Sequence, residues 1–190
     1  MLGKRKRHEE PLAVAGLEEP EIDPETGLIA AARFEECIEK EIARGLRYGS
    51  RSALALFEVA IADRTQAERL PSPAPFVAQV LRKAVRGSDV LARVSPSLFA
   101  ALLIEAHSEG AGKFTERVRT GIGSHPYGRR PDGTALYARA WAGVAQWEPS
   151  MNSVGAYAGA AETALASTFR GYEAAQEWFR GEGTNKPFIA

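Results

Sequence analysis

The sequence predicts a mixed α/β fold, an α+β sandwich in which helices flank one central mixed sheet. Amphipathic segments with a helical period alternate with short apolar segments of strand length. Their predicted order is a helix followed by β-α-β-β-α-β-α, in which the two adjacent strands form a hairpin. The chain has 190 residues, of which 45% are hydrophobic, and this is enough to bury one sizeable core.

The first predicted elements follow an N-terminal tail. Residues 1–22 are charged and interrupted by prolines, with no sustained apolar period, so we expect a flexible tail. Its basic run at residues 4–7 is interpreted as part of a solvated tail, with a docking arm for an anionic partner as the alternative. Residues 28–49 predict a helix that ends at Gly49, and residues 52–62 predict a buried strand. The apolar residues at helical spacing in this first helix are Leu28, Ala31, Phe34, Ile38, Ile42 and Leu46.

The second half of the chain continues the alternation. Residues 75–87 predict a helix that closes on Gly87, with Arg86 in its last turn. Residues 89–94 and 97–106 predict a hairpin around a Ser-Pro-Ser connection. The remaining elements are a helix over 108–123, a long strand over 135–147 and a last helix over 153–181. The aromatic side chains of this last helix, which we expect to pack in the core, are Tyr157, Phe169, Tyr172, Trp178 and Phe179.

Composition narrows the classes of function. The chain has 24 basic and 24 acidic residues, a balance that disfavours a nucleic-acid or membrane-surface binder. The single cysteine, Cys37, excludes an internal disulfide framework, and His8, His107 and His125 are too scattered to suggest a metal site. No apolar run approaches the roughly 20 residues of a membrane span, and no apolar segment follows the charged N-terminus as in a secretory signal. We therefore expect a cytoplasmic protein without a metal site.

Short motifs along the chain occur in the order and at the spacing of one known family. They are DPETGL at 23–28 with Phe34 downstream, SALALFEV at 52–59, the R-x-x-D-x-x-x-R pattern of Arg86, Asp89 and Arg93, ERVR at 116–119 and AAETAL at 160–165. In these motifs the chain resembles the GGDEF family, the diguanylate cyclase domains of bacterial signalling. The resemblance covers residues 23–182 as one domain, followed by a C-terminal tail at 183–190. It implies a nucleotidyl-cyclase-like mixed sheet flanked by helices.

The resemblance also shows which catalytic residues of the family this chain lacks. Synthesis of cyclic di-GMP from two GTP molecules needs two divalent ions, which take carboxylate ligands. Glu58 matches one family acid, but the neighbouring acidic position is Ala60, and the signature tip at 95–99 reads SPSLF, without a carboxylate. The guanine-binding segment is replaced by residues 61–76, and the phosphate-binding lysine position falls near Phe169. The resemblance therefore implies a degenerate, non-catalytic domain that needs no metal or cofactor.

A second site of the family is retained. The Arg-x-x-Asp before the signature is the family's inhibitory site, where cyclic di-GMP binds. Its Asp stands six positions before the signature, as Asp89 does before Ser95, and a second Arg stands eighteen positions after it, as Arg117 does after Phe99. Arg86, Asp89 and Arg117 are therefore the implied cyclic di-GMP-binding residues. An Arg fork can donate to guanine O6 and N7 or to a phosphate, and a carboxylate can accept from guanine N–H groups.

Two interpretations of these residues remain open. Arg86 at a helix C-terminus would interact favourably with the helix dipole, so the cluster could be purely structural. The leading hypothesis is a catalytically inactive receptor for cyclic di-GMP that signals through a homodimer or an unidentified protein partner. The alternative is a ligand-independent dimerisation or scaffold module with the same fold. Residual nucleotide chemistry through Glu58 is a third hypothesis.

Overall fold

The computed structural model describes residues 21–61 and 70–181. Its elements are β1 (Ile29–Ala30), α1 (Ala31–Tyr48), β2 (Ser52–Ile61), α2 (Ala74–Ala84), β3 (Val90–Arg93), β4 (Leu98–Ile104), α3 (Ser108–Ser124), β5 (Gly128–Arg129), β6 (Ala135–Leu136), β7 (Ala138–Gln146) and α4 (Val154–Gly181). Most of the two predicted tails, including the basic run at residues 4–7, lies outside the described residues. At the end of the first tail, Glu21 and Ile22 pair with the chain at β1.

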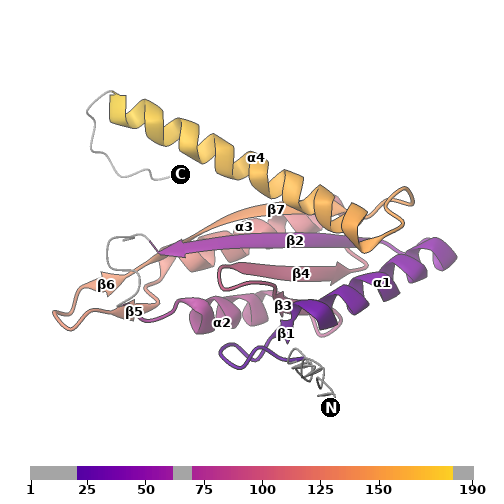
Figure 1. Cartoon of the computed structure of the whole chain (residues 1–190), viewed down its shortest axis with the longest axis horizontal. Coiled ribbons are helices and arrows are strands. Elements are labelled where there is room, and N and C mark those ends of the chain that lie inside the picture. The colour runs from indigo at the N-terminus through magenta and orange to yellow at the C-terminus, as the bar shows by residue number, and fades with distance from the viewer. Residues whose placement is uncertain (1–20, 62–69, 182–190) are drawn as a thin grey trace, which may run out of the picture.

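One mixed sheet organises the fold, as predicted. Its five strands lie side by side in the order β1-β3-β4-β2-β7 (Figure 1). Only β1 and β3 run parallel, and the other pairs are antiparallel. The inner strand β2 lies between β4 and β7 and has helices over both faces, which explains why its sequence, SALALFEVAI, is almost continuously apolar.

Helices cover both faces of this sheet, so the core has two halves. On one face, α2 and α3 pack their apolar stripes against alternate residues of β2, such as Phe57. On the other face, α1 and α4 pack against the intervening residues, such as Leu56. Among the described residues, the largest side chain that is fully buried is Tyr157 of α4, and it belongs to this second half.

The predicted long strand over 135–147 is wrong in one respect, because the chain forms two strands there. The pairing of β2 with β7 runs as far as Ile61 and Ala138 among the described residues, and Ala135 and Leu136 form the separate strand β6. They pair instead with β5 in a separate two-stranded ribbon, which projects from the sheet in Figure 1. Tyr137 at the junction is 45% exposed.

Two helix predictions also need correction. The helix α2 ends at Ala84 rather than at Gly87, because Val85 already has an extended backbone with ψ at 164°. Arg86 therefore lies beyond the helix. In α1 the predicted end is confirmed, since Gly49 caps it with φ at 66°, but Leu46 is 55% exposed and does not join the core.

The aromatic side chains of α4 are described only in part. Tyr157 is fully buried, and the ring of Phe169 lies 5.1 Å from that of Trp141, centroid to centroid. The side chains of Tyr172, Trp178 and Phe179 lie outside the described part of the structure. Within the described ranges, no helix has both the length and the apolar character needed to cross a membrane.

Candidate functional site

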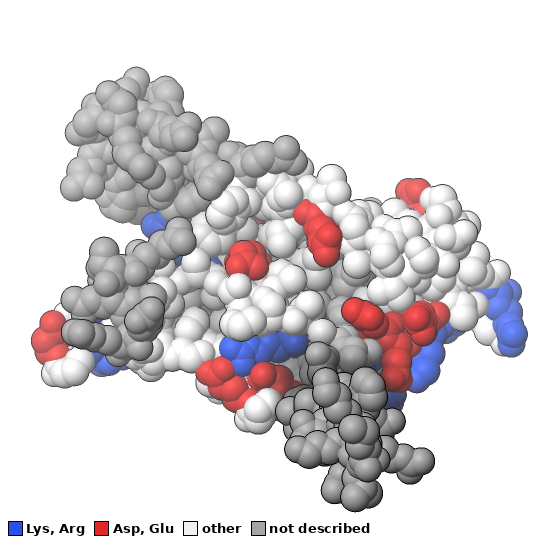
Figure 2. Space-filling view, in the orientation of Figure 1, with Lys and Arg blue, Asp and Glu red and all other residues white. Residues whose placement is uncertain are grey.

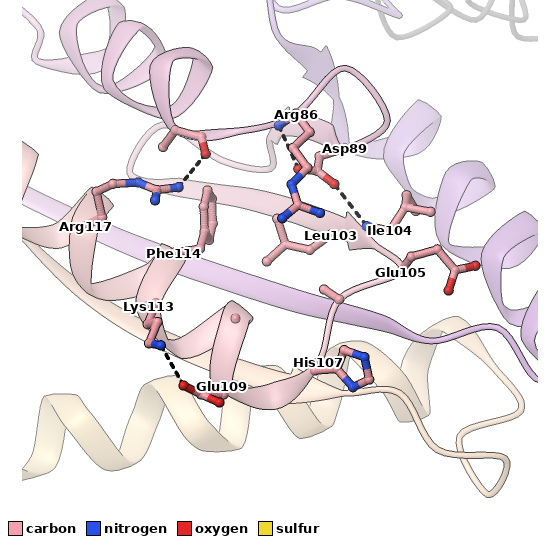
Figure 3. Close-up of a pocket in the computed structure, with 13 residues that line it drawn as sticks. Arg86, Asp89, Leu103, Ile104, Glu105, His107, Glu109, Lys113, Phe114 and Arg117 are labelled. Carbon is pink, nitrogen blue, oxygen red and sulfur yellow. Dashed lines mark hydrogen bonds and ion pairs between the residues drawn. The ribbon is translucent and has the colours of Figure 1, made fainter.

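The three residues implied by the sequence line one pocket. Arg86 and Asp89 come from the turn between α2 and β3, and Arg117 comes from α3 (Figure 3). The pocket has a volume of about 570 Å³, and its floor includes Leu103 of β4 and Phe114 of α3. The fold thus brings together residues that lie up to 31 positions apart in the chain.

Asp89 has a clear structural role in this pocket. Its Oδ2 accepts a hydrogen bond from the backbone N–H of Arg86 at 2.9 Å, and its Oδ1 accepts one from the N–H of Ile104 at 3.1 Å. The Asp89 N–H in turn donates to the Arg86 carbonyl at 3.1 Å. The carboxylate therefore closes the turn and fastens it to the end of β4. A carboxylate has about four acceptor positions, so about two remain for a ligand.

Arg117 also has a partner within the domain. Its Nη2 donates to the carbonyl of Ala84 at 2.7 Å, which satisfies one of the free carbonyls at the end of α2. Its guanidinium carbon lies 6.0 Å from the centroid of the Phe114 ring. The remaining N–H groups of this exposed side chain are available to a ligand, because a guanidinium has five donors.

Arg86 differs from the other two residues. Its side chain is exposed and extends into the pocket toward Leu103 in Figure 3. Among the described residues, no hydrogen bond or ion pair to its guanidinium is found. The sequence placed Arg86 in the last turn of α2, but the helix ends at Ala84, so Arg86 lies two residues beyond it. Arg86 therefore presents a complete donor fork to the pocket.

The remaining charged residues of the pocket were not singled out from the sequence. Lys113 pairs with Glu109 at 2.6 Å, and both are exposed. His107 lies 3.1 Å from the guanidinium of Arg51. Glu105 lines the pocket wall and has a positive φ of 50°. Only Lys113 had a sequence signal, because it stands four positions before Arg117 and so shares its helix face.

Comparison with protein-family models identifies the fold. The model described as "Diguanylate cyclase, GGDEF domain" matches residues 75–170. The chain belongs to the GGDEF family. The predicted family and its central mixed sheet are thereby confirmed. A comparison with curated protein sequences gives no match.

Solved structures support the same assignment of the GGDEF fold. The GGDEF domain of DgcB from Caulobacter crescentus, in complex with c-di-GMP, matches with a TM-score of 0.71 and 19% identity, over 80% of this chain and 92% of that chain. The GGDEF domain of FimX from Pseudomonas aeruginosa matches with a TM-score of 0.68 and 21% identity, over 80% and 95%. The diguanylate cyclase SiaD from P. aeruginosa, in complex with its activator SiaC, matches with a TM-score of 0.71 and 23% identity, over 79% of this chain and 58% of SiaD.

The signature tip of this GGDEF domain is a short connection that satisfies its own polar groups. Ser95 Oγ accepts a hydrogen bond from the N–H of Leu98 at 3.1 Å, and the N–H of Val94 donates to the Leu98 carbonyl at 2.8 Å. Arg93 Nη2 donates to the carbonyl of Pro96 at 3.1 Å. No carboxylate belongs to residues 95–99. The tip is therefore closed by serine, proline and backbone groups.

The described residues around Glu58 do not form the carboxylate cluster that would hold the two metal ions of a cyclase. Glu58 is half-buried on β2, where it pairs with Leu98 and Trp141 on the neighbouring strands. In the described ranges, no group of three or more His, Cys, Asp or Glu residues is placed to hold a metal ion. Hard divalent cations need several oxygen ligands, and in the part of the chain that the structure describes Glu58 is not joined by enough of them. The position expected for a phosphate-binding lysine, near Phe169, is filled by the aromatic contact with Trp141.

The Asp23 turn of the family motif has a structural function. Asp23 Oδ2 accepts a hydrogen bond from the N–H of Thr26 at 2.8 Å, and Asp23 pairs with Arg93 of the hairpin at 3.2 Å. Burial would raise the pKa of Asp23, but the hydrogen bonds from Thr26 and Arg93 outweigh it and lower the pKa. Arg82 of α2 donates to the Thr26 carbonyl at 2.6 Å. The turn thus fastens the hairpin and α2 together, which fixes the frame of the pocket.

The charges on the surface agree with the balanced composition. Figure 2 shows acidic and basic side chains interspersed on this face of the molecule, with neither sign dominating. On this face, the described residues therefore form no broad basic surface of the kind that binds nucleic acid.

Proposed function

We propose that this GGDEF domain is a non-catalytic receptor that binds cyclic di-GMP at Arg86, Asp89 and Arg117 and signals through protein–protein interaction. The observation that supports the proposal most strongly is their convergence on one pocket of about 570 Å³. The resemblance to the family implies the same three residues, and all three line that pocket.

The chemistry of the pocket suits a ligand with two guanines and two phosphates. The fork of Arg86 can donate two parallel hydrogen bonds to a phosphate or to guanine O6 and N7. Arg117 keeps most of its donors, and Asp89 keeps acceptor positions for guanine N–H groups. The DgcB domain, which has the same fold, was solved in complex with c-di-GMP, and this also supports the proposed ligand.

The absence of cyclase activity is proposed from the residues at the signature. The tip has no carboxylate, Pro96 has no backbone N–H to donate to a phosphate, and Glu58 has no second acid beside it at Ala60. Phosphoryl transfer depends on metals, positioning and charge stabilisation, and the loss of several of these together removes the reaction rather than slowing it slightly.

Isothermal calorimetry with cyclic di-GMP tests the proposed ligand. We expect binding by the unaltered chain and a loss of about tenfold or more in affinity in Arg86→Ala, since a bidentate contact contributes about 1–3 kcal/mol. The matched control is Arg119→Ala, which removes an exposed arginine of α3 that pairs with Glu116 and does not line the pocket. No binding at tens of micromolar ligand would reject the receptor. Equal affinity in Arg86→Ala would reject the site.

A scaffold function without ligand is the second candidate. One observation favours it, because Asp89 and Arg117 both form hydrogen bonds inside the domain and would be useful to the fold without any ligand. Arg86 separates the two functions, because its guanidinium has no such bond among the described residues. The same titration therefore decides between them. Binding of a protein partner is known for a protein of the same fold, because SiaD was solved in complex with its activator SiaC.

A further inference from the structure

The wall of the pocket includes an acidic residue that does not suit an anionic ligand. Glu105 follows the end of β4 and is exposed. Its φ of 50° is unusual for a residue with a side chain. In Figure 3 its carboxylate points away from Arg86 and the centre of the pocket. A carboxylate free to turn inward would repel phosphate groups and would also be an ion-pair partner for the open fork of Arg86.

Arg44 of α1 holds the Glu105 carboxylate in this outward position. Its Nη2 donates to Glu105 Oε1 at 2.7 Å, across 61 positions of sequence. Its Nη1 lies 3.5 Å from Oε2 of Glu41, one turn earlier on α1. Arg44 therefore bridges two carboxylates, one in the core and one at the pocket wall.

The buried carboxylate fixes the position of Arg44. Glu41 is only 7% exposed, and its Oε1 has no hydrogen-bond partner. Burial raises the pKa of Glu41, while the neighbouring Arg44 opposes this and Glu105 adds to it. The positive charge of Arg44 offsets the cost of burying an ionised Glu41. This attraction holds the arginine side chain between the two acids.

A second connection ties Glu105 to the ligand-binding residues. Asp89 Oδ1 accepts the N–H of Ile104, the residue directly before Glu105. The backbone position of Glu105 is thus set by Asp89, and its side-chain direction is set by Arg44.

We propose that Arg44 is a positioning residue of the ligand pocket, which keeps the Glu105 carboxylate outside so that an anionic ligand meets Arg86 and Arg117 unopposed. The proposal rests on the proposed binding of cyclic di-GMP. It assigns to α1 a part in ligand recognition, although no residue of α1 lines the pocket.

The test compares the affinity for cyclic di-GMP, at low salt, of the full chain and of four variants. Arg44→Ala is expected to weaken binding about threefold to tenfold, because it leaves an uncompensated carboxylate at the pocket wall. Arg44→Ala combined with Glu105→Gln is expected to return to within about twofold of the unaltered chain. Glu105→Gln alone is expected to bind equally well or more tightly, because it leaves the charge of Arg44 unopposed. The matched control is Arg47→Ala, one turn further along α1, where the arginine lies over the ring of Tyr48 and is expected to change little.

The design separates the pocket from the stability of the fold. Glu41 stays unpaired in both Arg44 variants, and removal of the Glu105 charge also relieves its repulsion of Glu41. Urea unfolding of both variants is therefore measured beside the affinity, and a recovery of affinity without a matching gain in stability belongs to the pocket. Equal affinity in Arg44→Ala, or no recovery in the double variant, would overturn the proposal. If Arg44→Ala fails to fold, Glu105→Gln still decides, because weaker binding would mean that Glu105 itself contacts the ligand. Absence of binding by the unaltered chain would reject the receptor function and this inference with it.

Discussion

At the scale of single residues, the pocket contains residues of two kinds. Asp89 and Arg117 form hydrogen bonds within the domain, whereas the guanidinium of Arg86 forms none with the described residues. Asp89 uses both carboxylate oxygens on backbone N–H groups, and Arg117 satisfies the Ala84 carbonyl. The structural and ligand-binding interpretations of the motif are therefore both supported, for different atoms of the same cluster.

This division predicts different effects on stability. Asp89→Ala should lower the free energy of unfolding by about 1–3 kcal/mol, because two backbone N–H groups lose their partner. Arg86→Ala should change it by less than about 0.5 kcal/mol, as for other exposed positions. Urea denaturation of the two variants measures both values. A similar loss in the two would show that Arg86 also supports the fold.

The sequence predicted the members of this cluster but could not predict their hydrogen bonds. The spacing of Arg86, Asp89 and Arg117 is visible along the chain. The partners of Asp89 and Arg117 are the backbone of Ile104 and Ala84, and any residue type offers the same backbone groups. Arg44 gave no signal either, because its partner Glu105 is 61 positions away.

At the scale of elements, the contact between α4 and β7 depends on one glycine. A Cβ at Gly143 would lie 2.1 Å from the backbone N of Leu165 and 2.6 Å from the carbonyl of Ala161. Backbone atoms cannot move aside as the end of a side chain can. Gly143 therefore sets how closely α4 approaches the sheet.

Gly143→Ala should accordingly destabilise the protein by about 3 kcal/mol or more, because α4 must shift away from β7. The matched control is Gly112→Ala in α3, where an added Cβ meets open space and the change should be stabilising by up to about 1 kcal/mol. Thermal or urea unfolding of both variants tests this. A small effect at Gly143 would mean that α4 is not tightly packed on the sheet.

Element boundaries show what periodicity can and cannot reveal. The end of α1 was predictable because Gly49 adopts the left-handed backbone that glycine favours. The end of α2 was misplaced by three residues because Gly87 is equally typical of a helix end and of a turn. The division at Tyr137 was invisible because burial still alternates across it, and the pairing of Ala135 and Leu136 with β5 depends on a ribbon that the apolar pattern does not reveal.

At the scale of the whole molecule, the GGDEF fold is complete while the tip of its signature has a different chemistry. Two covered faces and the mixed sheet hold the hairpin in place. Both the tip at residues 95–97 and the Arg86–Asp89 turn are therefore held in defined positions. The turn, and not the tip, carries residues of the proposed ligand site.

Incubation of the chain with GTP and Mg²⁺ or Mn²⁺ should yield no cyclic dinucleotide, since residues 95–99 carry no carboxylate and Ala60 stands at the acidic position beside Glu58. Chromatography of the products, beside an active GGDEF cyclase under the same conditions, provides the measurement. Clear turnover would show that Glu58 and residues outside the tip suffice for the reaction.

The sequence by itself determined the family, the order of the main helices and strands and the members of the cluster, because these are encoded in apolar periodicity or in the spacing of short motifs along the chain. The tertiary structure decided which donors and acceptors of the cluster remain open, where the last strand divides, and that Arg44 of α1 pairs with Glu105 at the pocket wall. These features depend on pairs of groups that are distant in the chain and on backbone atoms that every residue shares, so no pattern in the sequence records them.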